Sequence, residues 1–317
     1  MRDENKPNPP VVNEGLDING FPETGCADLG RILDPKACAE LRQWIDERRP
    51  MVTSIFYQTD EEFRDKGRWH HYAPGSTDHN LLLTEGLDLG FIEENERFKR
   101  YAEALVGPGY QIMKKSVIRL VPSGVIPKWI MDYVCDVGRP NLNPFVHDEF
   151  QDVQYFLATD FHQDKTRPDS NFVTVYMYLD EVDPTYSALH ILKGSHKLGL
   201  THYPHLLRRS HADRRYWFYS DFNGNHEKCE EIVMTGKAGS VLCFHCLTLH
   251  GSRPNNSHNP RVSLRYLLAK GPNCREDALL DQANRLVYGP HRVARTRFDI
   301  APDGSYLRTG SSLLSYD

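Results

Sequence analysis

Two stretches in the first third of the chain carry apolar residues every three or four positions, the spacing typical of helices. The first begins at Asp34-Pro35, an N-cap residue followed by a first-turn proline, and ends near residue 50. The second runs from Asn95 to Val106 and stops at the glycine and proline residues 107–109. The pattern therefore predicts two helices, and residues 51–90 stay unassigned.

After residue 110 the period of the pattern changes to two, which is typical of strands. Glycine, proline and aspartate turns separate the alternating segments. This order of elements predicts a mainly β fold of the α+β kind, a jelly roll or β-sandwich buttressed by N-terminal helices. The predicted strands are Tyr110–Val121, Val153–Leu157, Phe172–Leu179, Leu189–Leu192, Gly239–Leu249 and Arg261–Leu268.

The 317 residues show neither an internal repeat nor a linker in mid-chain. Residues 1–15 are polar and rich in proline, and we interpret them as a disordered tail. Residues 16–317 are then a single domain, with a variable insertion near residues 200–232 that is rich in His, Arg and Tyr.

Charge and cysteine content narrow the class of protein. A net charge of -5, a pI near 6.3 and scattered basic residues argue against a nucleic-acid partner. Seven cysteines spread along the chain do not resemble a disulfide framework. No apolar run reaches membrane-spanning length, so we expect a cytoplasmic protein. The oligomeric state is left open.

The candidate chemistry lies in two short segments. If Phe161-His162-Gln163-Asp164 is extended, His162 and Asp164 share one face and can bind one metal ion together. His250 would be the third ligand. Two imidazoles and one carboxylate with open positions beside them are the arrangement expected of non-heme Fe(II) oxygenases.

The strand predicted to end at His250 contains two cysteines and a second histidine. Counting by twos from His250 places Cys246 and Phe244 on its face, and His245 on the other. The Cys243/Cys246 pair resembles half a zinc knuckle, but small residues packing a buried strand are the favoured reading.

Arg261 follows His250 by eleven residues. If the two neighbouring strands pair antiparallel, its guanidinium returns close to the metal, where it could bind a carboxylate through two parallel hydrogen bonds.

These residues carry a family resemblance. The segment 161–164, the run from Leu189 to Gly199, and His250-Gly251-Ser252 with Arg261 after it resemble the phytanoyl-CoA dioxygenase family of Fe(II)/2-oxoglutarate oxygenases. The resemblance spans roughly residues 30–270. It implies a double-stranded β-helix, the cupin-like jelly roll, with the metal at one open end.

The resemblance also implies roles. His162, Asp164 and His250 would bind Fe(II). Arg261 would bind the far carboxylate of the cosubstrate 2-oxoglutarate, and Ser252 would add a hydrogen bond to it. With O2, 2-oxoglutarate would be decarboxylated to succinate and CO2 while a small organic substrate is oxidised. Because the carboxylate of Asp164 is present, hydroxylation is favoured over halogenation.

Several residues near these segments have open roles. Gln163 must point to the opposite face of its strand and could fix the ligand segment by hydrogen bonding. Three residues on neighbouring strands could either line the cosubstrate pocket or pack the sheet: Gln154, Thr174 and Tyr176. A lysine could assist with 2-oxoglutarate, and the spacing does not choose between Lys114 and Lys115.

Substrate recognition is expected in loops at the rim of the barrel. Basic residues there could bind an anionic substrate, although solvated surface charge is commoner; they are Lys165, Arg167, Arg208 and Arg209. Two other functions remain open. One is a cupin-like metal-dependent hydrolase, in which the same three ligands activate water. The other is a non-catalytic metal- or ligand-binding protein.

Overall fold

The computed structural model describes residues 11–12, 17–67, 75, 80–138, 140–164, 171–201, 206–220, 226–287, 298–300 and 306–308. The α-helices are α1 (Phe21–Thr24), α2 (Pro35–Arg48), α3 (Asp60–Lys66), α4 (Leu81–Thr84), α5 (Gly90–Glu93), α6 (Glu96–Val106), α7 (Lys128–Val137) and α8 (Leu279–Leu286). Short 3-10 helices are η1 (Ile18–Gly20), η2 (Thr53–Ile55), η3 (Ser123–Val125), η4 (Asn143–Phe145), η5 (Asp148–Phe150) and η6 (Ser195–Leu198).

The strands form two large sheets and one hairpin. The seven-stranded sheet has the strand order β5-β12-β7-β10-β9-β8, with β1 beside β10. The six-stranded sheet has the order β2-β11-β6-β13-β3-β4. The strands are β1 (Val11–Val12), β2 (Cys26–Arg31), β3 (Gln111–Leu120), β4 (Gln154–Phe156), β5 (Thr159–His162), β6 (Val173–Tyr178), β7 (Leu189–Leu192), β8 (Leu206–Arg209), β9 (Tyr216–Ser220), β10 (His226–Met234), β11 (Ser240–His245), β12 (His250–Ser252), β13 (Arg261–Ala269), β14 (Phe298–Ile300) and β15 (Tyr306–Arg308).

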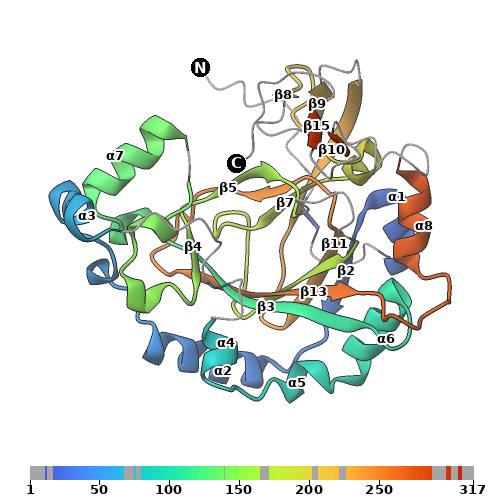
Figure 1. The fold of residues 1–317 in the computed structure, drawn as a ribbon, viewed down its shortest axis with the longest axis horizontal. Helices are drawn as coiled ribbons and strands as arrows, with labels where there is room; N and C mark the ends of the chain where they lie inside the picture. The colour runs from blue at the N-terminus through green and yellow to red at the C-terminus, as the bar shows by residue number, and fades with distance from the viewer. Residues whose placement is uncertain are drawn as a thin grey trace.

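The two sheets face each other and enclose a shared interior (Figure 1). Side chains of both sheets meet in one buried cluster, for example Tyr176 and Phe244 from the six-stranded sheet and Ile191 from the other. Consecutive strands alternate between the sheets from β4 to β7 and again from β10 to β13. This is the predicted jelly roll, and the fold class is confirmed.

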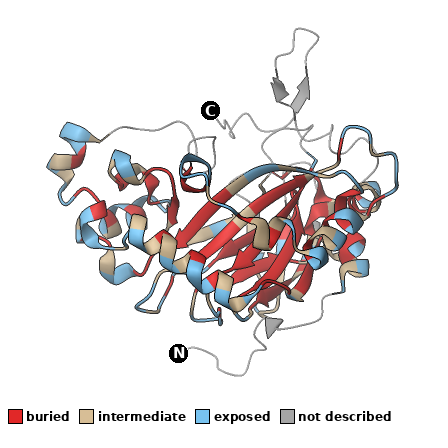
Figure 2. Ribbon diagram, turned by 90° about the horizontal axis from the view of Figure 1, so that it is seen from below, coloured by how far each residue is buried: buried red, intermediate tan, exposed pale blue. Residues whose placement is uncertain are grey.

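Helices cover the outer face of the six-stranded sheet, where α2, α4, α5 and α6 lie below β3 and β13 in Figure 1. Asp34 caps α2 by accepting a hydrogen bond from the Lys36 amide at 3.1 Å, and Asn95 caps α6. Apolar residues of both helices join the sheet in one core cluster. Both helices that the sequence predicts are therefore present, and they buttress a sheet as expected. Figure 2 shows buried residues concentrated in the strands, with exposed residues along the helices at the outside.

Strand β13 separates this core from the interior by alternation. Val262, Leu264 and Tyr266 point to the helices and belong to the outer core cluster. Arg261 and Arg265 lie on the opposite face, toward the other sheet, because side chains alternate along a strand. The polar face of β13 is thus inside the barrel.

The predicted strand Gly239–Leu249 is too long. Strand β11 ends at His245, where a turn forms with the Thr248 amide donating to the His245 carbonyl at 2.8 Å. The His245 ring accepts the Leu247 amide at 3.0 Å and holds the turn. Counting by twos from His250 therefore fails, because the chain is not extended between the two histidines.

Several elements lie outside the prediction. The unassigned region contains α3, α4 and part of α5, and α7 and α8 were not predicted at all. The segment expected as a variable insertion contains β8, β9 and most of β10. Short helices and strands with mixed polarity have a weak periodic signal, which explains why the pattern missed them.

The ends of the described chain and its cysteines add three facts. Val11–Val12 pairs in parallel with residues of β10, while the rest of the expected tail lies outside the described residues.

All seven cysteines are free, and Cys243 and Cys246 are buried in two different apolar clusters. Over the part of the chain that is described, none of the helices has the length and apolar character needed to cross a membrane.

A buried carboxylate ties the β8–β9 hairpin to the seven-stranded sheet. Glu231 is fully buried and accepts hydrogen bonds from His190 Nδ1 and Trp217 Nε1, both at 2.7 Å. Arg209 and Arg253 lie beside it. Burial raises the pKa of Glu231, but the bonds from His190 and Trp217 and the charge of Arg209 outweigh it and hold the pKa at about 2.

We expect Glu231→Gln to lower the free energy of unfolding at neutral pH by about 3 kcal/mol, because removing one partner leaves buried charge unmatched. The folded-state pKa is depressed, so this contribution is present above the usual glutamate pKa and disappears as pH falls through about 2. Glu230→Gln is the control, since Glu230 pairs with Lys193 at the half-exposed surface. Chemical denaturation should show a loss below about 1 kcal/mol there; equal losses would contradict the assignment.

Candidate active site

His162 and His250 lie opposite each other on two paired strands. His162 ends β5, His250 begins β12, and the two are partners in the antiparallel register. Their ring centroids are 4.2 Å apart. His162 Nδ1 donates to the Asp160 carbonyl at 2.7 Å, and His250 Nδ1 donates to the Thr248 carbonyl at 3.0 Å. Each ring therefore has its Nε2 free to act as a ligand.

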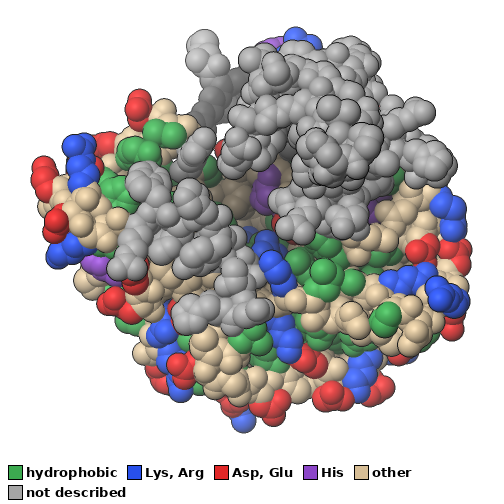
Figure 3. Space-filling model, viewed as in Figure 1, with side chains coloured by type: hydrophobic (Ala, Val, Ile, Leu, Met, Phe, Trp, Pro, Cys, Tyr) green, Lys and Arg blue, Asp and Glu red, His purple; other side chains and the backbone are tan. Residues whose placement is uncertain are grey.

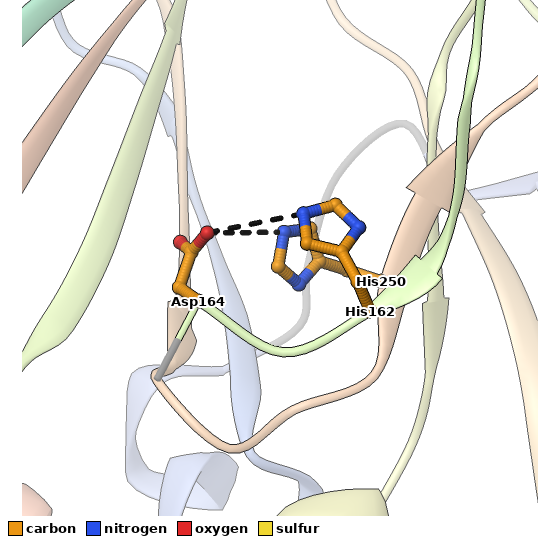
Figure 4. A group of neighbouring side chains, drawn as sticks. All are labelled: His162, Asp164 and His250. Carbon is orange, nitrogen blue, oxygen red and sulfur yellow. Dashed lines mark ion pairs between the residues drawn. The ribbon is translucent and has the colours of Figure 1, made fainter. Parts of the chain in front are cut away.

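Asp164 completes the group from the bend that follows β5 (Figure 4). Its Oδ1 lies 3.9 Å from His162 Nε2 and 3.7 Å from His250 Nε2. Ligand atoms of the three residues all lie within 4.8 Å of one another. Thr174 on β6 donates its hydroxyl to Asp164 Oδ2 at 2.6 Å, which fixes the carboxylate with Oδ1 toward the imidazoles.

The protonation states suit metal binding. Burial raises the pKa of Asp164, but the nearby His250, Arg265 and His162 outweigh it and hold the pKa at about 2. Burial, with His162 alongside, lowers the pKa of His250 to about 3. At neutral pH the site therefore offers a carboxylate and a neutral imidazole, the forms that bind a divalent metal ion.

Gln163 fixes the ligand segment, as the sequence suggested. Its amide nitrogen donates to the Gly199 carbonyl at 2.9 Å and to the Leu247 carbonyl at 2.7 Å. Its amide oxygen accepts from the Thr201 amide at 2.8 Å. The residue between two candidate ligands thus links their segment to two other loops.

The route by which the three side chains converge differs from the prediction. Asp164 lies beyond the end of β5, so alternation along a single strand does not place it beside His162. The bend after His162 turns the carboxylate back, and Thr174 holds it there. The structure brings together the three residues named from the sequence, but the extended geometry assumed for them is wrong.

Arg261 lies inside the barrel, with only 1% of its surface exposed. Its Nη1 donates to the Ser187 carbonyl, and its guanidinium carbon lies 5.6 Å from the centre of the Tyr178 ring. The predicted pairing of its strand with that of His250 is wrong, because β12 and β13 belong to opposite sheets. The arginine points into the shared interior from the facing sheet.

Arg265 is a candidate functional residue that the sequence reasoning missed. It lies four residues after Arg261 on the inner face of β13, and its Nη1 is 3.4 Å from Asp164 Oδ1. The available signal was the alternation of Arg261, Ser263 and Arg265 with apolar residues along β13. A polar side in an otherwise buried strand indicates a ligand-lined interior.

Buried polar atoms without a hydrogen-bond partner gather on this inner face. Within the described residues they are Ser116 Oγ, Gln154 Oε1, Arg261 Nε, Ser263 Oγ and Arg265 Nε. Such atoms are costly unless a ligand or water satisfies them. Their chemistry, two guanidinium groups among hydroxyls and an amide, fits an anionic molecule such as a dicarboxylate. Figure 3 shows a histidine and basic side chains in a hollow of the molecular surface on the side viewed.

The Ser252 hydroxyl already has hydrogen-bond partners within the protein. Its hydroxyl accepts the Thr159 amide at 3.1 Å and lies 3.1 Å from the Thr159 hydroxyl. It borders a cavity of about 490 Å³ that His190 and Trp217 also line. A contact between Ser252 and 2-oxoglutarate therefore stays a prediction.

The remaining basic candidates separate clearly. Lys115 forms an ion pair with Glu93 at 2.5 Å, and this pair lies outside the barrel interior. Arg209 binds the buried Glu231 and supports the β8–β9 hairpin. Arg208 lies on β8, whereas Lys165 and Arg167 lie outside the described residues.

Comparison with known proteins gives one family. The model of the phytanoyl-CoA dioxygenase family matches residues 21–263. Ectoine dioxygenase of Stutzerimonas stutzeri (strain A1501) is 26% identical over 52% of this chain and 56% of its own length. A probable alpha-ketoglutarate-dependent hypophosphite dioxygenase of Stutzerimonas stutzeri is 29% identical over 34% of this chain and 37% of its own length. The matched segment thus spans about half or less of these curated relatives.

A solved structure is also similar. The crystal structure of EvdO2 from Micromonospora carbonacea var. aurantiaca is 18% identical, with a TM-score of 0.49, over 84% of this chain and 96% of that one.

We expect Thr174→Val to weaken Mn(II) binding by about tenfold, because it removes the hydrogen bond that orients Asp164. Thr185→Val is the matched control, since Thr185 donates a bond of the same length, 2.6 Å, to the exposed carboxylate of Asp183. Equilibrium dialysis with Mn(II) measures both. Equal affinities in the two variants would show that Thr174 does not position the ligand.

Proposed function

The chain belongs to the phytanoyl-CoA dioxygenase family, and from that premise we propose that it is an Fe(II)- and 2-oxoglutarate-dependent dioxygenase. It hydroxylates a small organic substrate while 2-oxoglutarate is converted to succinate and CO2. The observation that carries the proposal is the convergence of two imidazoles and one carboxylate within 4.8 Å, with a buried guanidinium in the same interior.

In this proposal His162, Asp164 and His250 hold the iron from one side. Three protein ligands would leave the metal able to bind other molecules, as the chemistry of such oxygenases requires. When bound, iron supplies the activation of dioxygen, with electrons that come from the oxidative decarboxylation of 2-oxoglutarate. The protein keeps the ligand atoms in place through Thr174 and Gln163.

Arg261 binds the far carboxylate of 2-oxoglutarate. Its side chain is buried in the barrel, so the ion pair forms away from bulk water, where charge-assisted hydrogen bonds are strongest. The Ser187 carbonyl orients one arm of the guanidinium, and Nε is without a partner among the described residues. A planar fork fixed in this way selects a carboxylate over a neutral group.

Apolar side chains between the sheets shield the His250 side of the site from water, whereas the His162 side chain is 37% exposed. The Phe244 ring lies 4.2 Å from that of His250, and Tyr178 and Ile191 fill the interior behind it. Exclusion of water protects a strongly oxidising centre from side reactions. The same packing keeps the His250 ring in one orientation.

Hydroxylation or a related oxidation is favoured over halogenation because Asp164 occupies the ligand position that a halide would need. Both curated relatives are named as dioxygenases, one acting on ectoine and the other on hypophosphite. A metal-dependent hydrolase would need the same ligands but would give the buried Arg261 no anion to bind. The oxygenase therefore accounts for more of the interior than the hydrolase does.

Succinate formation tests the proposal directly. The purified protein is incubated with Fe(II), 2-oxoglutarate and air, and succinate is measured against reactions that lack one component or contain Zn(II) instead. Slow decarboxylation without an organic substrate is expected, and it should require all three components. No succinate from protein shown to bind Fe(II) and 2-oxoglutarate would overturn the dioxygenase, and so would succinate formed equally with Zn(II), which has no redox chemistry.

We expect Arg261→Lys to raise the dissociation constant of 2-oxoglutarate at least about tenfold, equivalent to about 1.4 kcal/mol, because lysine keeps the charge but loses the two-pronged contact. Titration of the Mn(II) protein with 2-oxoglutarate measures it. Arg64→Lys is the control, since Arg64 is exposed and pairs with Asp60 on the surface of α3. An unchanged constant in Arg261→Lys would remove this arginine from the cosubstrate site.

A further inference from the structure

A second guanidinium lies beside the candidate metal ligands. Arg265 Nη1 is 3.4 Å from Asp164 Oδ1, the oxygen that faces both imidazoles. The Arg265 side chain is 16% exposed, whereas Arg261 is 1% exposed. Arg265 is therefore on the solvent-accessible side of the pair, and Arg261 is in the closed part of the barrel.

The surroundings of Arg265 supply little negative charge. In the β13 register its neighbours are Ser116 on β3 and Tyr176 on β6, both uncharged groups at neutral pH. Asp164 is the carboxylate that contacts it among the described residues, at the long end of the hydrogen-bond range. The Arg265 Nε is buried and has no partner there. The fork thus has donors left for another ligand.

Arg265 adds a positive charge beside the proposed metal. The proposed function places a dication, Arg261 and Arg265 in one interior, against Asp164 and the two carboxylates of 2-oxoglutarate. Asp28 on β2 is a further buried carboxylate, but it lies near Tyr178, on the Arg261 side of the interior. Beside Arg265 the described residues supply the carboxylate of Asp164, which the metal would share, so a further anion there would be stabilised.

We propose that Arg265 binds the anionic group of the substrate, a carboxylate or a phosphorus oxyanion, so that the enzyme acts on a small organic anion held beside the metal. The inference rests on the proposed function and adds the substrate class. An arginine fork matches both kinds of oxyanion geometrically, so the two are distinguished by experiment.

The test uses Mn(II) as a paramagnetic metal and saturating 2-oxoglutarate. Methylphosphonate and carbon-13-labelled propionate are the anionic probes, and propionamide is the neutral one. The measurement is the enhancement of phosphorus and carbon nuclear relaxation, which reports a probe close to the metal even when it binds weakly. At least one anionic probe is expected to show an enhancement about fivefold or more larger in the wild type than in Arg265→Gln, because the variant loses a charge-assisted hydrogen bond.

Arg64→Gln is the control, because it removes the same charge from an exposed position on α3. It should keep the wild-type enhancement, and propionamide should not distinguish the variants. Arg265→Lys, which keeps the charge without the fork, should lie between the wild type and Arg265→Gln. Equal enhancement in Arg265→Gln and Arg64→Gln, or none for either anion in the wild type, would overturn the inference.

Separate titrations with Mn(II) and with 2-oxoglutarate distinguish substrate binding by Arg265 from two other roles. If it only positioned Asp164, Arg265→Gln would weaken Mn(II) binding; if it held the cosubstrate, 2-oxoglutarate binding would fall instead. Either result would overturn the substrate role, which predicts that Mn(II) affinity is kept or increased because a positive charge near the dication is removed. Wild-type protein that binds neither Mn(II) nor 2-oxoglutarate would refute the proposed function itself, whereas normal binding of both with indifferent probes would refute only the role of Arg265.

Discussion

The alternation of side chains along β13 is the constraint on which both the core and the candidate site depend. One face carries Val262, Leu264 and Tyr266 into the packing against the helices. The other carries Arg261 and Arg265 into the space between the sheets. A shift of the register by one residue would expose the apolar face to the interior and bury the arginines among helices. The helical layer therefore fixes the direction in which the guanidinium groups point.

The buried charges determine which partners the interior needs in order to be stable. A guanidinium or carboxylate far from water is tolerated only with partners, and the partners here come from both sheets. Asp164 receives bonds from Thr174 and Arg265, while Arg261 has the Ser187 carbonyl and the face of Tyr178. Several donors stay unsatisfied among the described residues. An interior arranged in this way favours binding of anions and metal ions over a closed apolar core.

Much of this arrangement could be predicted from the sequence, and the failures have physical causes. Periods of 3.6 and 2 located α2, α6 and the long strands, since these elements bury one face each. Periodicity cannot locate a turn held by a side chain, so the break after His245 was missed. Nor does it show which sheet a strand joins, which is why β12 and β13 were wrongly paired. Arg265 was not predicted because the family resemblance assigns the binding of 2-oxoglutarate to Arg261 and gives no role to a second arginine.

The distance between the candidate metal ligands and the two arginines depends on more than the contact between Arg265 and Asp164. His162 lies on the edge strand β5 and His250 on the neighbouring strand β12 of one sheet, while both arginines come from the facing sheet. The spacing of the sheets depends on the apolar residues between them, including Ile191, and packing at protein density resists changes in that spacing. Gln163 and Thr174 then orient individual ligands within it. Sheet packing thus determines the size of the ligand that fits between iron and guanidinium, and the polar residues determine its charge.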